Sequence, residues 1–134
     1  MNLNGKVAVV TGGSNGIGEA ISKKLKELGA KVIIFDTKEP KSTFEYYKVN
    51  ITKDNEIKET VNLIDKVDIL VNNAGIYFEK YIEQTTDEDI DNMVDVNIKG
   101  TFKVTRNLID KLKESKGCIV NIASCLGLVP ELTS

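Results

Sequence analysis

The sequence contains no histidine, and it has only two cysteines and two prolines among 134 residues. The absence of histidine excludes Ser-His-Asp and Cys-His nucleophiles and every zinc or iron site that needs an imidazole ligand. Two cysteines alone cannot complete a structural zinc site, so we expect no metal site. Ten glycines combined with so few prolines also exclude collagen-like and low-complexity chains.

Other scarce features bear on the compartment and the partners. Cys118 and Cys125 occur without a Cys-x-x-Cys spacing and without a secretory leader, which favours a reduced cytoplasmic location and no disulfide. No apolar run approaches the roughly 20 residues that cross a bilayer, so we expect no membrane insertion. The 18 basic residues are interspersed with 20 acidic ones, and this distribution argues against a nucleic-acid partner.

Short apolar runs alternate with segments of helical periodicity along the chain. This alternation predicts an α/β fold of the Rossmann type, a doubly wound parallel sheet with helices on both faces. No internal repeat or linker interrupts residues 1–134, which we interpret as part of a single domain. The predicted strands are Lys6–Thr11, Ala30–Phe35, Glu45–Ile51, Val67–Val71 and Cys118–Ile122. The predicted helices run from Ile17 to Leu28, from Thr52 or Asp54 through Ile64, and, broken once, from a capping box at Thr86 and Asp89 to Lys113.

A glycine-rich segment, Thr11 to Gly18, lies between the first strand and the first helix. Backbone N–H groups at a helix N-terminus bind phosphates, and glycines let a ligand approach them closely. Asp36 ends the second strand 20 residues after Gly16, the offset at which an acid accepts hydrogen bonds from an adenosine ribose. A carboxylate there repels a 2′-phosphate, so NAD is favoured over NADP. Lys38 lies close to Asp36 in the sequence and could attract that phosphate, so NADP stays an alternative. The alternatives are a glycine turn without a ligand and a solvated acid.

Two further polar residues are candidates for a reaction site. Asn97 shares a helical face with apolar residues, so its amide should point toward the interior. It either clasps a neighbouring loop or holds a water in an active site, and the spacing alone leaves both readings open. Ser124 follows the last strand, at the sheet edge where such folds bind ligands, although most serines there form turns.

These residues resemble the classical short-chain dehydrogenase/reductase family. The resemblance rests on the glycine loop, on Asn72 to Gly75, on Asn97 and on Asn121 to Ser124, in the family's order. It implies hydride transfer between NAD(P) and a carbonyl or secondary alcohol, with Ser124 and Asn97 as catalytic residues. It also implies a small-molecule substrate and a homo-oligomer, either a tetramer or a dimer. The cofactor-binding residues it implies are Gly12, Ser14, Asn15, Gly16, Ile17, Gly18, Asp36, Asn50, Asn73, Ala74 and Gly75.

The sequence departs from the family in lacking the Tyr-x-x-x-Lys pair, because none of its four tyrosines has a lysine four residues later. We therefore expect this chain to be the N-terminal portion of a longer enzyme. The final strands of that enzyme's sheet would lie outside these 134 residues. Ile76, Tyr77, Phe78 and the segment 126–130 predict an apolar substrate pocket with an aromatic hydroxyl. A sugar or polyol is slightly favoured as the substrate over a 3-ketoacyl compound or a hydrophobic ketone. The competing function is a dinucleotide-binding module without catalysis.

Overall fold

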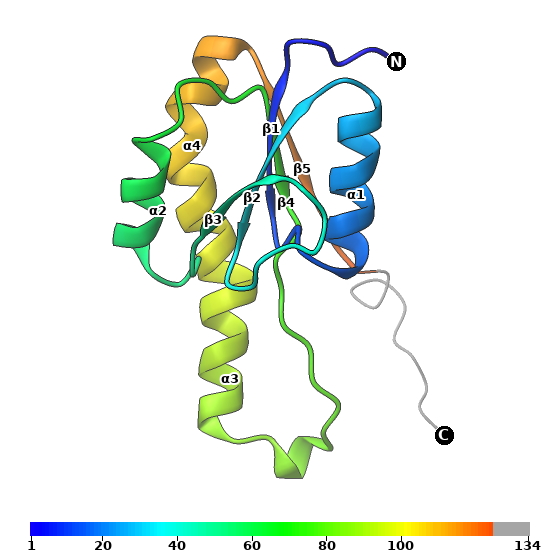
Figure 1. The fold of residues 1–134 in the computed structure, drawn as a ribbon. Helices are drawn as coiled ribbons and strands as arrows, with labels where there is room; N and C mark the ends of the chain where they lie inside the picture. The colour runs from blue at the N-terminus through cyan, green and yellow to red at the C-terminus, as the bar shows by residue number, and fades with distance from the viewer. Residues whose placement is uncertain (125–134) are drawn as a thin grey trace.

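The computed structural model describes residues 1–124 and has one parallel sheet of five strands in the order β3-β2-β1-β4-β5 (Figure 1). All four neighbouring pairs are parallel, so the carboxyl ends of the strands lie at the same edge of the sheet. The strand order reverses beside β1, which is a topological switch point, and ligands bind at such points in open α/β sheets. The strands are β1 (Val7–Thr11), β2 (Lys31–Asp36), β3 (Glu45–Lys48), β4 (Ile69–Asn72) and β5 (Cys118–Asn121).

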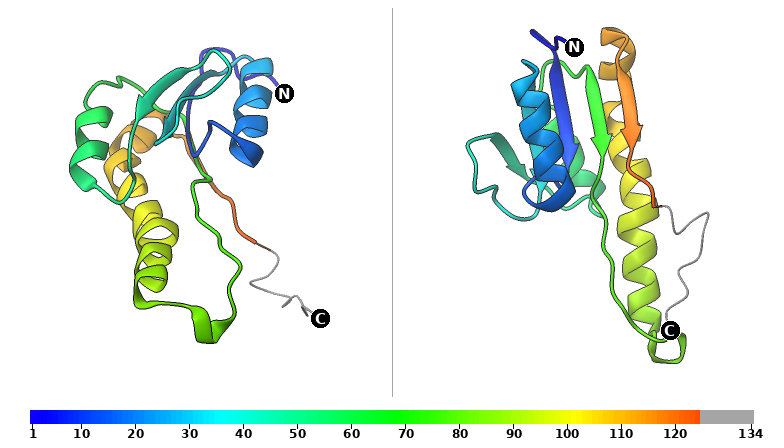
Figure 2. Two further views of the ribbon diagram at one scale, coloured as in Figure 1. Left: turned by 60° about the horizontal axis from the view of Figure 1, so that its bottom comes forward. Right: turned by 90° about the vertical axis from the view of Figure 1, so that its right-hand side faces the viewer.

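Helices cover both faces of the sheet, as the alternating pattern predicted. The helical elements are α1 (Gly16–Glu27), α2 (Asp54–Val61), the short η1 (Ile82–Gln84), α3 (Asp87–Met93), η2 (Val94–Gly100) and α4 (Thr101–Ser115). Helix α1 lies on one face, and α2 and α4 lie on the other (Figures 1 and 2). The doubly wound Rossmann-type architecture predicted from the sequence is therefore confirmed.

Neighbouring strand residues point to opposite faces and build two separate cores. Val9 and Ile33 belong to the larger core, which α2 and α4 complete with Ile57, Val61, Val104, Leu108 and Leu112. Val10 and Ile34 belong to the smaller core, against which Ile21 and Leu25 of α1 pack. Since the central strands are covered on both sides, they are uniformly apolar, which is the pattern that predicted a parallel sheet.

The predicted long helix is present and starts at the predicted capping box. Thr86 Oγ1 accepts a hydrogen bond from the Asp89 backbone N–H at 3.1 Å, and the Asp89 carboxylate accepts one from the Thr86 N–H at 3.0 Å. The predicted break corresponds to η2, where seven residues adopt the wider π-helical geometry while the helix continues into α4. A side chain at Gly100 would meet Ile51 Cδ1 at 2.6 Å, so the glycine allows the helix to pack closely there.

Several boundaries differ from the prediction by a few residues. Strand β3 ends at Lys48 rather than at Ile51, because Asn50 turns the chain toward α2 by bonding to Thr52. Ile64 is buried in the larger core but follows the end of α2. Strand β5 is an edge strand that pairs only with β4, and its Ile119 and Val120 are 37% and 45% exposed.

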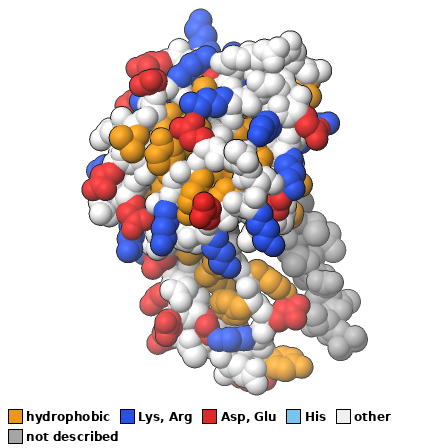
Figure 3. All heavy atoms as spheres, viewed as in Figure 1, with side chains coloured by type: hydrophobic (Ala, Val, Ile, Leu, Met, Phe, Trp, Pro, Cys, Tyr) orange, Lys and Arg blue, Asp and Glu red, His pale blue; other side chains and the backbone are white. Residues whose placement is uncertain are grey.

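The long helix and the segment after β4 extend past the carboxyl edge of the sheet (Figure 2). On the face shown in Figure 3, apolar side chains gather in the hollow between this extension and the body of the molecule, while acidic and basic side chains are mixed elsewhere. Within residues 1–124, no helix is both long enough and apolar enough to span a membrane.

Candidate active site

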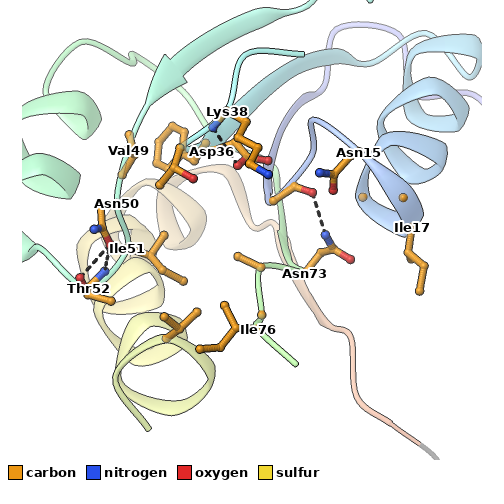
Figure 4. A pocket seen from close by; sticks show the side chains of 18 of the residues that line it. Asn15, Ile17, Asp36, Lys38, Val49, Asn50, Ile51, Thr52, Asn73 and Ile76 are labelled. Atoms are coloured by element: carbon orange, nitrogen blue, oxygen red, sulfur yellow. Dashed lines mark hydrogen bonds between the residues drawn. The ribbon is translucent and has the colours of Figure 1, made fainter. Parts of the chain in front are cut away.

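A cavity of about 680 Å³ opens at the carboxyl ends of β1, β2 and β4 and beside the residues that follow β3 (Figure 4). The first four strands of the chain and helix α1 therefore contribute to one site, as expected for a topological switch point. Ten of the eleven predicted cofactor-binding residues line it: Gly12, Asn15, Gly16, Ile17, Gly18, Asp36, Asn50, Asn73, Ala74 and Gly75.

The start of α1 suits an anionic ligand. The N-cap residue Asn15 makes no side-chain capping hydrogen bond, so its side chain leaves the first N–H groups of the helix to other partners. Gly16 has a φ of +54°, and a Cβ built on it would meet no atom within 4 Å, which shows that this side of the loop faces open space. Because amides and the positive end of the helix dipole meet at an open wall, the loop fits a diphosphate.

Gly18 has a different structural role in the same loop. A Cβ at this position would overlap the Gly12 carbonyl oxygen and the Asn73 amide nitrogen. Asn73 Nδ2 donates to the carbonyl oxygens of Thr11 and Gly12 at 3.1 and 3.0 Å. Gly18 is thus required for close packing between α1, the glycine loop and the end of β4.

Thr11 strengthens this junction from the end of β1. Its Oγ1 accepts hydrogen bonds from the backbone N–H groups of Asn73 and Ala74, both at 3.0 Å. Its side chain is 2% exposed, so water cannot replace these bonds. The residues after β4 are therefore held against the glycine loop by both backbone and side-chain contacts.

Asp36 lies at the end of β2 and at the edge of the cavity, where an acid was predicted. One carboxylate oxygen accepts the Ser14 backbone N–H at 3.1 Å, and the other accepts the Lys38 backbone N–H at 3.2 Å. Ser14 is the one predicted cofactor-binding residue that does not line the cavity, since its hydroxyl donates to the Lys38 carbonyl oxygen at 2.6 Å. Its direct contact with a cofactor stays a prediction.

Asn50 lines the opposite side of the cavity, but its side-chain oxygen is already engaged. Asn50 Oδ1 accepts bonds from the Thr52 backbone N–H at 3.0 Å and from the Thr52 hydroxyl at 2.7 Å. The Asn50 backbone N–H donates to Glu56 Oε2 at 2.8 Å, and this bond is the main reason that the pKa of Glu56 lies below its ordinary value. Asn50 therefore shapes the turn that walls the cavity.

A second cavity of about 380 Å³ adjoins the first and contains both predicted catalytic residues, Ser124 and Asn97. Asn97 lies on η2 and bonds to the backbone of Ile76 twice, accepting from its N–H at 2.8 Å and donating to its carbonyl oxygen at 2.9 Å. The loop-clasp interpretation of Asn97 is thus the one the geometry shows. The expected burial is wrong, because Asn97 is exposed beyond the edge of the sheet.

Asn72 connects the second cavity to the interior. Its Nδ2 donates to Thr105 Oγ1 on α4 at 3.0 Å and to Asn121 Oδ1 on β5 at 2.9 Å. Asn72 and Asn121 are paired across the two strands, so their amides meet directly. Through this contact the end of β5, three residues before Ser124, is tied to the helix that carries Asn97.

The segment after β4 lies partly against the two described cavities, and the role of Tyr77 and Phe78 in a substrate pocket stays a prediction. Ile76 lines the first cavity, whereas Tyr77 is 73% exposed and neither Tyr77 nor Phe78 lines either cavity. The predicted pocket residues 126–130 lie outside the described residues. Lys80 ties this segment to α3, since its ammonium lies 2.5 Å from the Asp89 carboxylate.

Several cavity residues were missed by the sequence reasoning. Thr37, Lys38, Val49, Ile51, Thr52, Asn92 and Val96 all line the first cavity. The sequence did point to Lys38, because this lysine follows Asp36 closely in the sequence and was considered as a partner for the 2′-phosphate of NADP. Nothing in the sequence pointed to Asn92 and Val96, because the phase of a helix with a π-helical stretch cannot be read from a regular period.

The comparison with known families decides the relationship. The family model described as short chain dehydrogenase matches residues 6–133. The chain belongs to the short chain dehydrogenase family. Its sequence is 39% identical to an uncharacterized oxidoreductase of Thermotoga maritima and 36% identical to a 3-oxoacyl-[acyl-carrier-protein] reductase FabG of Rickettsia bellii. Both matches cover 96% of this chain and 57% of the relative, so the chain spans little more than half of each relative.

Solved structures of short chain dehydrogenases show the same fold. The ligand-free aldohexose dehydrogenase of Thermoplasma acidophilum superposes with a TM-score of 0.92 at 29% identity, over 97% of this chain and 53% of that one. A short chain dehydrogenase of Leptospira borgpetersenii with bound NAD⁺ gives a TM-score of 0.91 at 33% identity, over 97% and 56% of the two chains. The predicted family and fold are thus confirmed.

Proposed function

We propose that this chain forms the cofactor-binding part of an NAD-dependent oxidoreductase that transfers hydride between nicotinamide and a carbonyl or secondary alcohol. The observation that carries the proposal is the open wall at Gly16 beside the uncapped start of α1, with Asp36 at the edge of the same cavity. The bound cofactor supplies the hydride chemistry. The NAD⁺ named in the Leptospira structure belongs to that protein and supports the choice of ligand here.

In this proposal, two groups of the chain bind the adenosine diphosphate part of the cofactor, one at its diphosphate and one at its ribose. The N–H groups at the start of α1 donate to the diphosphate, and Asp36 accepts hydrogen bonds from ribose hydroxyls. Each carboxylate oxygen can accept two hydrogen bonds, and each Asp36 oxygen uses one on a backbone amide. Two acceptor positions therefore remain for a ribose diol, whereas a 2′-phosphate would be repelled.

We propose a sugar or polyol as the substrate. Support comes from the aldohexose dehydrogenase among the structural neighbours and from five side chains of the second cavity that can hydrogen-bond a hydroxyl-rich ligand, namely Asn72, Asn97, Thr101, Asn121 and Ser124, which lie among apolar ones such as Ile122 and Ala123. A 3-oxoacyl thioester is the second candidate, because relatives at 34–37% identity carry the name 3-oxoacyl-[acyl-carrier-protein] reductase. In both cases Ser124 would hydrogen-bond the substrate oxygen, and Asn97 would hold the segment at Ile76 that separates the two cavities.

We also propose a homo-oligomer. The support is a pair of large apolar side chains one helical turn apart on the long helix, Ile98 and Phe102, which are 53% and 74% exposed. Sedimentation of the chain at several concentrations tests this proposal, and a monomer at all of them would contradict it.

Calorimetric titration of the chain with NAD⁺ and NADP⁺ tests the cofactor assignment. We expect saturable binding of NAD⁺ and weaker binding of NADP⁺, and Asp36→Ala should narrow the difference between them because the carboxylate that repels the 2′-phosphate is lost. No binding of either nucleotide would refute the proposal. Turnover is then tested on the longer enzyme of which this chain is expected to be the N-terminal portion, with aldohexoses, polyols and 3-oxoacyl thioesters and by following NADH. NAD⁺ binding without turnover of any of them by that protein would favour the non-catalytic module.

A further inference from the structure

Ser14, Asp36 and Lys38 form a closed ring of three hydrogen bonds at the edge of the cofactor cavity. The Asp36 carboxylate accepts the backbone N–H of Ser14 at 3.1 Å and that of Lys38 at 3.2 Å. The Ser14 hydroxyl closes the ring by donating to the Lys38 carbonyl oxygen at 2.6 Å. The ring joins the glycine loop after β1 to the turn after β2, two segments 24 residues apart in the sequence.

Of the three bonds in the ring, the closing bond is the one whose donor is a side chain, the Ser14 hydroxyl. Both bonds to Asp36 come from backbone N–H groups, and these donors survive any substitution at Ser14 other than proline. Ser14 is 6% exposed, so water has little access to replace its hydroxyl at the Lys38 carbonyl. Removing the hydroxyl would therefore release the turn after β2 without removing any group that lines the cavity.

The ring positions two opposite charges. Its two backbone amides fix the plane of the Asp36 carboxylate, which leaves the remaining acceptor positions at a set angle to the cavity. Lys38 is held at both its N–H and its carbonyl, so its backbone is fixed at the cavity edge, and its exposed side chain starts from that point (Figure 4). The affinity for a negatively charged 2′-phosphate depends on this pair of charges much more than the affinity for a neutral 2′-hydroxyl does.

We infer that the Ser14 hydroxyl is a positioning group for cofactor discrimination, which acts by holding the turn that carries Asp36 and Lys38. The inference rests on the proposed dinucleotide site. With the ring closed, the fixed carboxylate binds a ribose diol and repels a 2′-phosphate. With the ring open, the turn at Lys38 is held to the glycine loop only through the Asp36 carboxylate, so the carboxylate is positioned less firmly and both the attraction and the repulsion decrease.

The test compares Ser14→Ala with the unmodified chain by calorimetric titration with NAD⁺ and with NADP⁺. We expect NAD⁺ to bind roughly fivefold more weakly, the factor that corresponds to the loss of one buried hydrogen bond. NADP⁺ affinity should change less or rise, so the dissociation constant for NADP⁺ divided by that for NAD⁺ should fall. An unchanged ratio in a folded variant would overturn the inference.

Ser115→Ala is the matched control. The Ser115 hydroxyl donates to the Val67 carbonyl oxygen at 2.7 Å, across 48 residues, near the opposite edge of the sheet from the cavity. This variant also loses a serine-to-carbonyl bond between distant segments, and it should leave the ratio of the NADP⁺ to the NAD⁺ dissociation constant unchanged. If Ser115→Ala lowered the ratio as much as Ser14→Ala, the effect would be one of general stability and the inference would fail.

Amide hydrogen exchange on the unmodified chain tests the ring without any variant. In the ligand-free chain the N–H groups of Ser14 and Lys38 should exchange slowly, because both donate to Asp36. Exchange of both at unprotected rates would overturn the inference even if Ser14→Ala did not fold. If the unmodified chain binds neither nucleotide, the proposed function fails and the inference fails with it, whereas NAD⁺ binding with an unchanged ratio refutes the inference alone.

Discussion

Alanine at Gly18 should mainly lower the stability of the chain, whereas alanine at Gly16 should mainly weaken its binding of NAD⁺, although the two glycines belong to the same loop. At Gly18 the new Cβ would overlap the Gly12 carbonyl oxygen and the Asn73 amide, which makes the bonds that hold the loop. At Gly16 the new Cβ would meet nothing within 4 Å, and the cost is that of a left-handed backbone at φ +54°. One substitution therefore attacks the packing of the loop, and the other places a methyl group where the diphosphate is proposed to lie.

The expected magnitudes differ enough to be measured. For Gly18→Ala, overpacking costs about 1–3 kcal/mol and the loss of a buried hydrogen bond about 1 kcal/mol more, so we expect the free energy of unfolding to fall by about 3 kcal/mol. For Gly16→Ala, a left-handed alanine costs about 1–2 kcal/mol, which the lower chain entropy of the unfolded state partly offsets. The net loss should be about 1 kcal/mol, while NAD⁺ affinity should fall at least about tenfold, equivalent to about 1.4 kcal/mol.

The assay combines urea unfolding followed by circular dichroism with NAD⁺ titration of each folded variant. Gly5→Ala is the matched control, because Gly5 also has a positive φ, +77°, and no atom within 4 Å, but it precedes β1 at the other end of the strand from the loop. It should lose about 1 kcal/mol of stability and keep its NAD⁺ affinity. If Gly16→Ala bound NAD⁺ like the unmodified chain, the open wall would not be the diphosphate site. If Gly18→Ala were as stable as Gly16→Ala, the packing argument would be wrong.

Two more predictions concern the segment between β4 and α4. Asn97→Ala removes both side-chain partners of the Ile76 backbone, so the exchange of the Ile76 amide hydrogen, measured by NMR, should accelerate by about fivefold or more, and an unchanged rate would show that the clasp is not formed in solution. The Lys80 ammonium and then the Thr86 backbone N–H lower the pKa of Asp89 to about 2, from an ordinary value of 3.8. Because this carboxyl has a lower pKa in the folded chain, its stabilisation is complete above pH 3.8 and is lost as the pH falls toward 2; Asp89→Asn should flatten the pH dependence of unfolding in that window, and an identical slope would contradict the assignment.

The sequence predicted best those parts of the fold in which the local pattern of apolar residues reflects burial on both faces of a strand. The runs around Val9 and Ile33 are apolar without alternation because helices cover both sides of the central strands, and such runs are readable. The residues of β5 are equally apolar, but this strand lies at an edge of the sheet. Periodicity reports the side chains of a strand and carries no information on how many strands flank it, so the exposure of Ile119 was not readable.

The candidate site shows the same division. The positions of the glycine loop and of Asp36 follow from the spacing of strand, turn and helix, and ten of the eleven predicted residues line the cavity. The orientation of polar side chains does not follow from spacing, because it depends on partners far away in the sequence. Ser14 turns toward Lys38, and Asn97 turns toward Ile76, in each case because an unpaired backbone carbonyl is available there.

The two consecutive asparagines at the end of β4 join the two halves of the site. Neighbouring residues of a strand point to opposite sides. Asn73 directs its amide to the carbonyls of Thr11 and Gly12, and so to the cofactor loop. Asn72 directs its amide to Thr105 and Asn121, and so to the helix and strand that carry Asn97 and Ser124. A cofactor and a substrate must meet at a fixed distance for hydride transfer. In the proposed hydride transfer, the adjacent amides of Asn72, the last residue of β4, and of Asn73, the residue after it, would fix the two halves of the site relative to each other through a single peptide unit.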